Sequence, residues 1–163
     1  MAFDMDGLKI DNLLNPDLVF MDVEAEDAES LLRRMAEEAR VRGFVKEGYA
    51  DAVLERERLY PTALPTEILK VAVPHSMDRD QVITPVIVVA TLKHPVNFKE
   101  MGEGVRDVPV DVVFLLAVCG SKDQLTILQK IIGLFSDREA MNGLKAAGSR
   151  EELIGALKAH LNE

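Results

Sequence analysis

Hydrophobic residues follow two different spacings along this chain. Over residues 25–42 and 46–58 they recur at helical spacing with charged residues between them, which predicts two amphipathic helices. Gly43 stands where a glycine commonly ends a helix. Runs without polar alternation indicate strands that are covered on both faces. Four short, nearly continuous apolar runs are typical of such strands: residues 18–21, 70–73, 85–92 and 110–118.

The last third of the sequence carries the same helix-start motif three times. Each copy has the form S-x-x-E/Q, in which the serine caps the helix and the third residue after it reaches back. The copies are Ser121 to Gln124, Ser136 to Glu139 and Ser149 to Glu152. Helices early and late, with strands between them, predict a sheet with helices packed on both sides. Residues 1–16 are predicted as a loose lead-in, residues 98–105 as a flexible loop, and residues 1–163 as one domain.

Composition and charge narrow the classes of function. The 163 residues are 48% hydrophobic and 29% charged, as in a globular protein that can bury a substantial core. The net charge of −9 argues against a nucleic-acid partner or an anionic membrane surface. No run of about 18 apolar residues is present, and Asp4 and Asp6 lie where a secretion signal would carry basic residues. The lone Cys119 cannot form an internal disulfide, so we expect a cytoplasmic protein.

His75 has the most suggestive setting of the three histidines. It follows a short apolar run that is stopped by Pro74, which has a fixed φ and no N–H. A neutral imidazole held at a strand end is a potential nucleophile near neutral pH. Alternatively, His75 is a turn residue without a role. His94 is predicted in a turn between strands, and His160 in the last turn of the terminal helix.

The sequence gives no support for a metal or a cofactor. The histidines and the single cysteine do not have the spacing of zinc ligands. No P-loop, G-x-G-x-x-G or G-x-S-x-G motif is present, so nucleotide binding and acyl transfer lack their usual signatures. We therefore expect no metal and no cofactor.

Several short motifs occur in a fixed order around His75. Arg56-Glu57 ends a predicted helix, Pro61-Thr62 lies in the loop that follows, and Val71-Ala72-Val73-Pro74-His75 ends the strand. Together with the later stretches 90–93, 112–118 and 123–129, this set resembles the enzyme IIA domains of the fructose/mannitol class (type 2) of the bacterial sugar phosphotransferase system. The resemblance covers nearly the whole chain. It implies an α/β fold with three α/β/α layers, a central mixed sheet and helices on both faces.

The resemblance also implies a phosphotransferase component with a phosphohistidine intermediate. In that family the histidine that matches His75 accepts a phosphoryl group from phospho-HPr and passes it to a cysteine of enzyme IIB. The transfer serves the uptake and phosphorylation of a sugar or polyol. HPr and enzyme IIB are thus the implied partners, and the membrane component is reached only indirectly. Phosphoryl transfer depends mainly on positioning and charge stabilisation, which agrees with the few polar residues in the motif.

Three further residues are expected to support His75. Arg56 offers a guanidinium to the phosphoryl oxygens, unless it is only a cation at a helix end. Thr62 offers a hydroxyl, unless it is only a turn residue. Gln124 stands where many members carry a second histidine, and it either hydrogen-bonds a nitrogen of His75 or only completes the Ser121 capping box. Gln124 and the longer loop before His75 resemble the galactitol-type branch most.

Two other functions stay open at this point. The first is a regulatory phosphoprotein of the nitrogen-type IIA kind, which would bind targets according to its phosphorylation state. The second is a domain of the same fold without phosphoryl chemistry, like the cytosolic domains of some anion transporters. The intact His75 motif and the lack of a transmembrane pattern argue against the second function.

Overall fold

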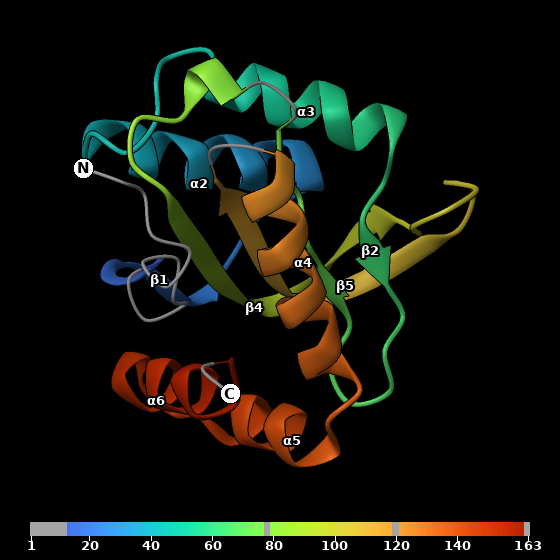
Figure 1. Cartoon of the computed structure of the whole chain (residues 1–163). Helices are drawn as coiled ribbons and strands as arrows, with labels where there is room; N and C mark the ends of the chain where they lie inside the picture. The colour runs from blue at the N-terminus through green and yellow to red at the C-terminus, as the bar shows by residue number, and fades with distance from the viewer. Residues whose placement is uncertain (1–12, 77–78, 119–120, 162–163) are drawn as a thin grey trace.

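The computed structural model of the chain describes residues 13–76, 79–118 and 121–161 (Figure 1). No helix in these ranges is long and apolar enough to cross a membrane. The elements follow one another as β1 Leu14–Val23, α2 Ala28–Val41, α3 Tyr49–Leu59, β2 Ala63–Leu64, β3 Val71–Ala72, the 3-10 turn η2 Arg79–Gln81, β4 Val86–Lys99, β5 Asp107–Ala117, α4 Ser121–Phe135, α5 Arg138–Ala146 and α6 Arg150–Leu161.

The strands form one mixed sheet with β4 and β5 near its centre. Within the described residues the sheet has five strands in the order β1-β4-β5-β3-β2. β1 runs parallel to β4 and β3 runs parallel to β5, whereas the β4–β5 and β2–β3 pairs are antiparallel. The mixed sheet implied by the resemblance is therefore confirmed.

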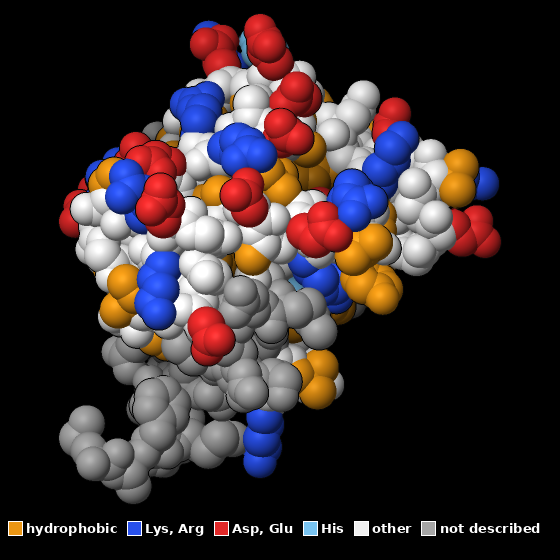
Figure 2. Space-filling model, turned by 90° about the horizontal axis from the view of Figure 1, so that it is seen from above, with side chains coloured by type: hydrophobic (Ala, Val, Ile, Leu, Met, Phe, Trp, Pro, Cys, Tyr) orange, Lys and Arg blue, Asp and Glu red, His pale blue; other side chains and the backbone are white. Residues whose placement is uncertain are grey.

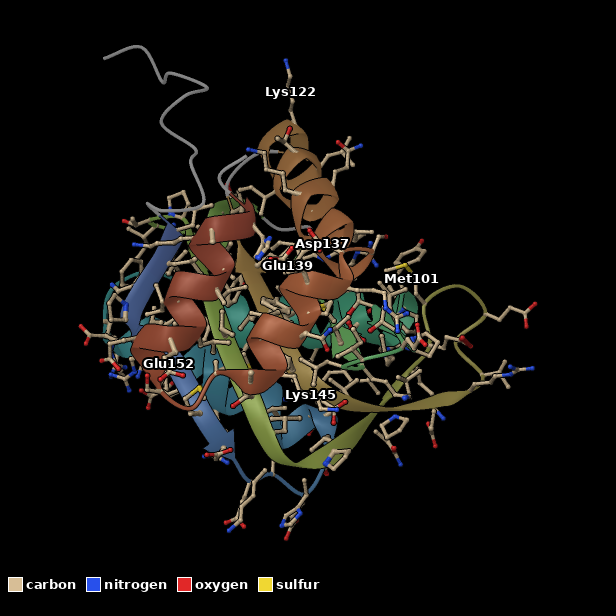
Figure 3. All side chains as sticks on the ribbon, turned by 90° about the horizontal axis from the view of Figure 1, so that it is seen from below. Met101, Lys122, Asp137, Glu139, Lys145 and Glu152 are labelled. Atoms are coloured by element: carbon tan, nitrogen blue, oxygen red, sulfur yellow. The ribbon has the colours of Figure 1, made fainter. Side chains whose placement is uncertain are left out.

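Helices cover both faces of this sheet (Figure 1). On one face, α2 and α3 pack against alternate residues of β4, among them Val86 and Val88. On the other face, α4, α5 and α6 pack against the residues in between, Ile87 and Val89. Figure 3 shows α5 and α6 side by side beneath the sheet. Both faces of β4 are buried, which explains its lack of polar alternation, and the three-layer α/β/α fold is confirmed.

The β4–β5 hairpin is longer than the sequence indicates. β4 continues to Lys99, so His94 lies inside a strand and the prediction of a turn there is wrong. The pairing register with β5 shifts around Pro95, because proline has no N–H to donate to the ladder. The connection between β4 and β5 covers residues 100–106, whereas a flexible loop over residues 98–105 was predicted.

The helix ends confirm two expected caps and correct a third. Gly43 follows α2 with a φ of +83°, a conformation that favours glycine. At α6 the Ser149 hydroxyl accepts a first-turn N–H at 3.1 Å. At α5 the cap is Asp137, whose carboxylate accepts the Ala140 N–H at 3.1 Å, and not Ser136 as predicted (Figure 3). An aspartate caps a helix as well as a serine and its charge also suits the helix dipole.

Some expectations concern the start of the chain and the lone cysteine. β1 begins at Leu14, so residues 14–16 belong to the sheet and not to a lead-in. Residues 1–12 and Cys119 lie outside the described residues.

Charged side chains of both signs are interleaved on the surface. Figure 2 shows Lys and Arg beside Asp and Glu over the upper face of the molecule. Ion pairs such as that between Arg33 and Asp51, 3.1 Å apart, join α2 to α3. Since at least half of each of these side chains is exposed, such a pair contributes at most about 1 kcal/mol. Despite the net charge of −9, side chains of both signs lie next to one another on this face.

Candidate active site

His75 is held beside the central sheet and not in a free turn. Pro74 was expected to end strand pairing, but its carbonyl still accepts the Leu116 N–H at 2.9 Å, and His75 pairs with Leu116 as an isolated parallel bridge. Proline lacks only the donor of a peptide unit, so its acceptor remains available to the neighbouring strand. The residue as a whole is only 6% exposed, and β5 lies alongside its backbone.

The hydrogen bond of the His75 ring determines which nitrogen is free. Nδ1 lies 2.9 Å from the carbonyl oxygen of Val73. A carbonyl oxygen can only accept, so Nδ1 carries the hydrogen of the neutral ring. Nε2 then keeps its lone pair, and it is the nitrogen able to attack an electrophile.

Burial keeps this ring neutral. Removal from water lowers the pKa of His75, the hydrogen bond to Val73 opposes that change, and the positive charge of Arg56 lowers the pKa further. A neutral imidazole is the nucleophilic form, so His75 is ready to react at neutral pH without first losing a proton.

Arg56 lies in the last turn of α3, and its charge reaches His75. Its Nη1 donates to the Tyr60 carbonyl at 3.1 Å, and the guanidinium carbon lies 4.5 Å from the centre of the Tyr60 ring. These two contacts hold the guanidinium in place. Its Nε is buried and has no hydrogen-bond partner in the described part of the chain. Arg56 is thus a fixed cation with an unused donor beside the candidate nucleophile.

Thr62 lies next to the backbone segment that carries His75, and its hydroxyl already makes two hydrogen bonds within the protein. The hydroxyl donates to Oε1 of Glu57 at 2.8 Å and accepts the Val73 N–H at 3.2 Å. The Thr62 N–H donates to the other oxygen of Glu57 at 3.0 Å. The hydroxyl proton expected to serve a phosphoryl group is therefore committed to Glu57, and Thr62 contacts the peptide that holds His75.

Glu57 is part of the Arg56-Glu57 motif, but the sequence does not predict a role for it. The structure turns its side chain away from solvent onto the loop after α3, where Thr62 donates to it twice. Burial raises the pKa of Glu57 to about 7, although the bonds from Thr62 and the charge of Arg56 act in the opposite direction. The available signal was an acidic residue five positions before a threonine, but nothing in the sequence shows that the chain turns back at that point.

The structure brings Arg56, Thr62 and His75 to one end of the sheet, whereas Gln124 is only partly placed. Gln124 lies in the first turns of α4, and its side chain is outside the described residues. Its expected contact with His75 stays a prediction. Among the described residues no cluster of three or more His, Cys, Asp or Glu could hold a metal ion.

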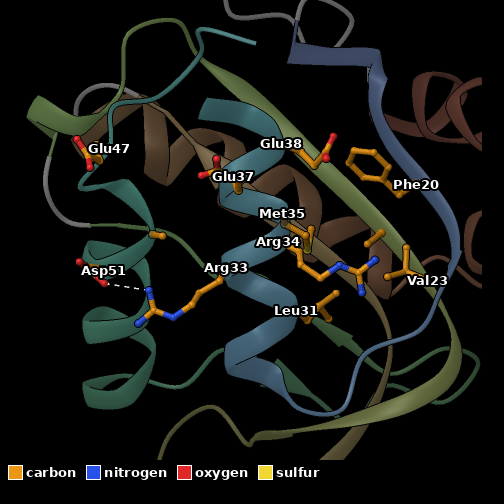
Figure 4. A pocket seen from close by; sticks show the side chains of 12 residues that line it. Phe20, Val23, Leu31, Arg33, Arg34, Met35, Glu37, Glu38, Glu47 and Asp51 are labelled. Carbon is orange, nitrogen blue, oxygen red and sulfur yellow. Dashed lines mark hydrogen bonds and ion pairs between the residues drawn. The ribbon is translucent and has the colours of Figure 1, made fainter. Parts of the chain in front are cut away.

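Two large surface hollows lie away from His75. One, of about 550 Å³, has Phe20, Leu31 and Met35 in its lining and charged residues of α2 and α3 at its rim (Figure 4). The other, of about 700 Å³, lies between α2, α3 and the β4–β5 hairpin and is bordered by Glu57. In Figure 4 the Arg33 side chain at the edge of the first hollow points toward Asp51 and donates a hydrogen bond to it.

Comparison with known protein families shows to which family this chain belongs. A family model described as "Phosphoenolpyruvate-dependent sugar phosphotransferase system, EIIA 2" matches residues 12–160. The chain belongs to this family. Membership in the EIIA 2 family confirms the resemblance found in the motifs around His75.

Similar proteins within the phosphotransferase system differ in length. The mannitol-specific enzyme IIA component of Halalkalibacterium halodurans is 28% identical over 147 residues, which cover 89% of this chain and 94% of that protein. The mannitol-specific EIICBA component of Pasteurella multocida is 29% identical over 86% of this chain, and the multiphosphoryl transfer protein of Escherichia coli O157:H7 is 32% identical over 82%. The chain spans only 22% and 34% of these two longer proteins.

Solved structures share the fold. A complex of enzyme IIAMtl and phosphorylated enzyme IIBMtl from Escherichia coli matches with a TM-score of 0.72 at 21% identity, over 90% of this chain and 99% of that one. The nitrogen regulatory protein IIA-Ntr of Neisseria meningitidis matches with a TM-score of 0.70 at 22% identity, over 91% and 98%. Both structures share this fold, and the proteins reported above with a named sugar are mannitol-specific. The galactitol assignment stays a prediction.

Removal of the Arg56 charge should raise the pKa of His75. In Arg56→Gln the ring loses a nearby positive charge that disfavours its protonation, so its NMR titration midpoint should move upward while burial still holds it below the ordinary value. Arg58→Gln is the matched control, because Arg58 lies on the same helix and pairs with Glu55 at 2.8 Å. If the His75 midpoint is the same in wild type and Arg56→Gln, the guanidinium does not act on the ring.

Proposed function

We propose that this domain is a phosphocarrier of the phosphoenolpyruvate-dependent sugar phosphotransferase system and that His75 is its phosphorylated residue. His75 accepts a phosphoryl group from phospho-HPr in the cytoplasm and passes it to a cysteine of enzyme IIB. The transfer supports uptake and phosphorylation of a sugar or polyol, which the Gln124 position suggests is galactitol-like. The observation that carries the proposal is the Nδ1 hydrogen bond to Val73, which leaves Nε2 of a buried neutral ring free to attack.

Both transfers are in-line displacements on phosphorus. In the first, the Nε2 lone pair attacks phosphorus while the bond from phosphorus to the donor nitrogen breaks, and that nitrogen keeps the electron pair. In the second, a thiolate sulfur of enzyme IIB attacks phosphorus and the P–Nε2 bond breaks, which returns the pair to His75. Neither step requires the Nδ1 proton to move, so the bond to Val73 can persist throughout.

Arg56 is assigned to the charge that collects on the phosphoryl oxygens. Its guanidinium is fixed by Tyr60, and its Nε–H has no partner among the described residues, so it can stabilise that charge with little reorganisation. Thr62 and Gln124 are assigned supporting roles. Thr62 acts through the peptide that holds His75, and Gln124 is expected near the ring from its position in α4.

Phosphorylation should depend on His75 alone among the histidines. Incubation with phosphoenolpyruvate, enzyme I and HPr should add one acid-labile phosphoryl group per chain, measured by intact mass before and after mild acid. His75→Gln should take up none, because an amide has no nucleophilic ring nitrogen. His94→Gln is the control, since His94 is exposed on β4, and it should be labelled like wild type. Labelling of His75→Gln would show that another residue is phosphorylated.

The next acceptor separates transport from regulation. A wild-type protein that passes its label to the cysteine of an enzyme IIB from its own genome acts in sugar uptake. A protein that keeps its label in the presence of every such enzyme IIB, yet binds a target in one phosphorylation state only, is a regulator of the nitrogen type. That outcome would overturn the transport role and leave the phosphorylation of His75 in place.

Loss of Arg56 should slow transfer more than it affects folding. Arg56→Ala removes charge-assisted hydrogen bonds worth about 1.5–3 kcal/mol, so the rate at saturating phospho-HPr should fall roughly 10- to 100-fold in rapid-quench measurements. Arg56→Lys should recover part of the rate, because it restores the charge but not the planar pair of donors. Arg58→Ala provides the matched control. A rate for Arg56→Ala within two-fold of Arg58→Ala would reduce Arg56 to a surface cation.

A further inference from the structure

The two backbone polar groups of Val73, which belong to successive peptide units, are both bound by side chains of the site. Its carbonyl accepts from Nδ1 of His75 at 2.9 Å, and its N–H donates to Oγ1 of Thr62 at 3.2 Å. Val73 is fully buried and lies just beyond the end of β3. The orientation of the acceptor that fixes the His75 ring therefore depends on Thr62 as well as on the sheet.

Thr62 is in turn oriented by Glu57. A hydroxyl has one hydrogen to donate, and here that hydrogen goes to Oε1 of Glu57 at 2.8 Å. An oxygen lone pair is thereby left facing the Val73 N–H. The Thr62 N–H holds the second carboxylate oxygen at 3.0 Å, so the carboxylate accepts from both donors of one residue. Glu57, Thr62, Val73 and His75 form a continuous chain of hydrogen bonds from the end of α3 to the ring.

We propose that Glu57 and Thr62 are positioning residues that restrain the backbone of Val73 through its N–H and thereby help its carbonyl to hold His75 in the tautomer with a free Nε2. This role rests on the proposed function only for its effect on phosphoryl transfer, because the tautomer exists without any partner. Glu57 contacts neither the ring nor the transferred group in this scheme. It acts through Thr62 and Val73.

A carboxylate suits this position better than a neutral side chain of the same shape. It offers an acceptor to each of the two Thr62 donors, whereas an amide offers one acceptor and places an N–H against the other donor. Burial makes the charged form costly, and the raised pKa of Glu57 is a sign of that cost. Glu57→Gln therefore keeps the volume and disrupts one of the two bonds to Thr62.

The tautomer of His75 in the unphosphorylated protein is the direct test. With ¹⁵N-labelled histidine, the ring nitrogen shifts give the ratio of the Nδ1–H to the Nε2–H form, measured at a pH above the pKa of Glu57 so that its side chain is a carboxylate. Thr62→Val has nearly the same shape but cannot accept the Val73 N–H, so the ratio should fall roughly three- to ten-fold, the value of one net hydrogen bond. Glu57→Gln should lower it in the same direction, and Thr62→Ser should restore most of it.

A matched change in the next loop, between β2 and β3, controls for general loosening. The Thr66 hydroxyl donates a hydrogen bond to the Leu69 carbonyl. Within the described residues it makes no hydrogen bond to Val73 or Glu57. Thr66→Val therefore makes the same chemical change outside the chain of bonds and should leave the tautomer ratio as in wild type. If Thr62→Val does not fold, Glu57→Gln decides the test, with thermal unfolding followed for every variant.

Kinetics distinguish positioning from docking and from a failure of the proposed function. At saturating phospho-HPr, Thr62→Val should lower kcat by the factor by which the fraction of the Nδ1–H form falls, and it should leave KM nearly unchanged because the binding surface is intact. Unchanged tautomer ratios in folded Thr62→Val and Glu57→Gln would overturn the positioning role, even if wild type is phosphorylated. Shifted ratios in a protein that accepts no phosphoryl group would support the positioning role and refute the phosphocarrier function.

Discussion

The chemistry assigned to this domain depends on one hydrogen bond, from Nδ1–H of His75 to the carbonyl of Val73, 2.9 Å away. That bond selects the neutral tautomer in which Nε2 is the nucleophile. An imidazole free to exchange tautomers would present the wrong nitrogen part of the time. A proton on both nitrogens would abolish the nucleophile, and burial opposes that protonation by lowering the pKa. The Val73 carbonyl thus determines which ring nitrogen is free, and the burial of His75 favours the unprotonated state of that nitrogen.

The fold supplies that carbonyl from the residue that follows a short strand. β3 has only two residues, Val71 and Ala72, yet it lies between β5 and β2 and contacts both. The Pro74 carbonyl continues the pairing with β5 after β3 ends. The segment that carries His75 is therefore anchored on one side by the sheet and on the other by Thr62. Arg56 comes from the end of α3, so elements from two layers of the fold meet at the ring.

Much of this arrangement follows from sequence patterns. The unalternating runs at 85–92 and 110–118 predicted strands buried on both faces, and the helices around them predicted the layers. The setting of His75 after an apolar run and a proline predicted a held imidazole. These features are local, because burial on both faces and a proline leave a direct mark on the residues nearby.

The remaining features depend on contacts that no local pattern specifies. The bond that Thr62 donates to Glu57 and the bond that it accepts from Val73 join positions 5 and 11 residues apart, and they form only when the loop after α3 folds back. Two adjacent acceptors, Ser136 and Asp137, compete to cap α5, and the geometry of the turn selects the aspartate. The length of the β4–β5 hairpin could not be predicted, because a proline such as the one inside β4 is more typical of a turn.

The position of phosphorus on the ring tests the central claim most directly. The domain is labelled with ¹⁵N-histidine, phosphorylated with phosphoenolpyruvate, enzyme I and HPr, and examined for coupling between ³¹P and the ring nitrogens. Phosphorus should couple to Nε2 of His75, while Nδ1 keeps its proton and its bond to Val73. Phosphorus on Nδ1 of His75, or on either other histidine, would contradict the account.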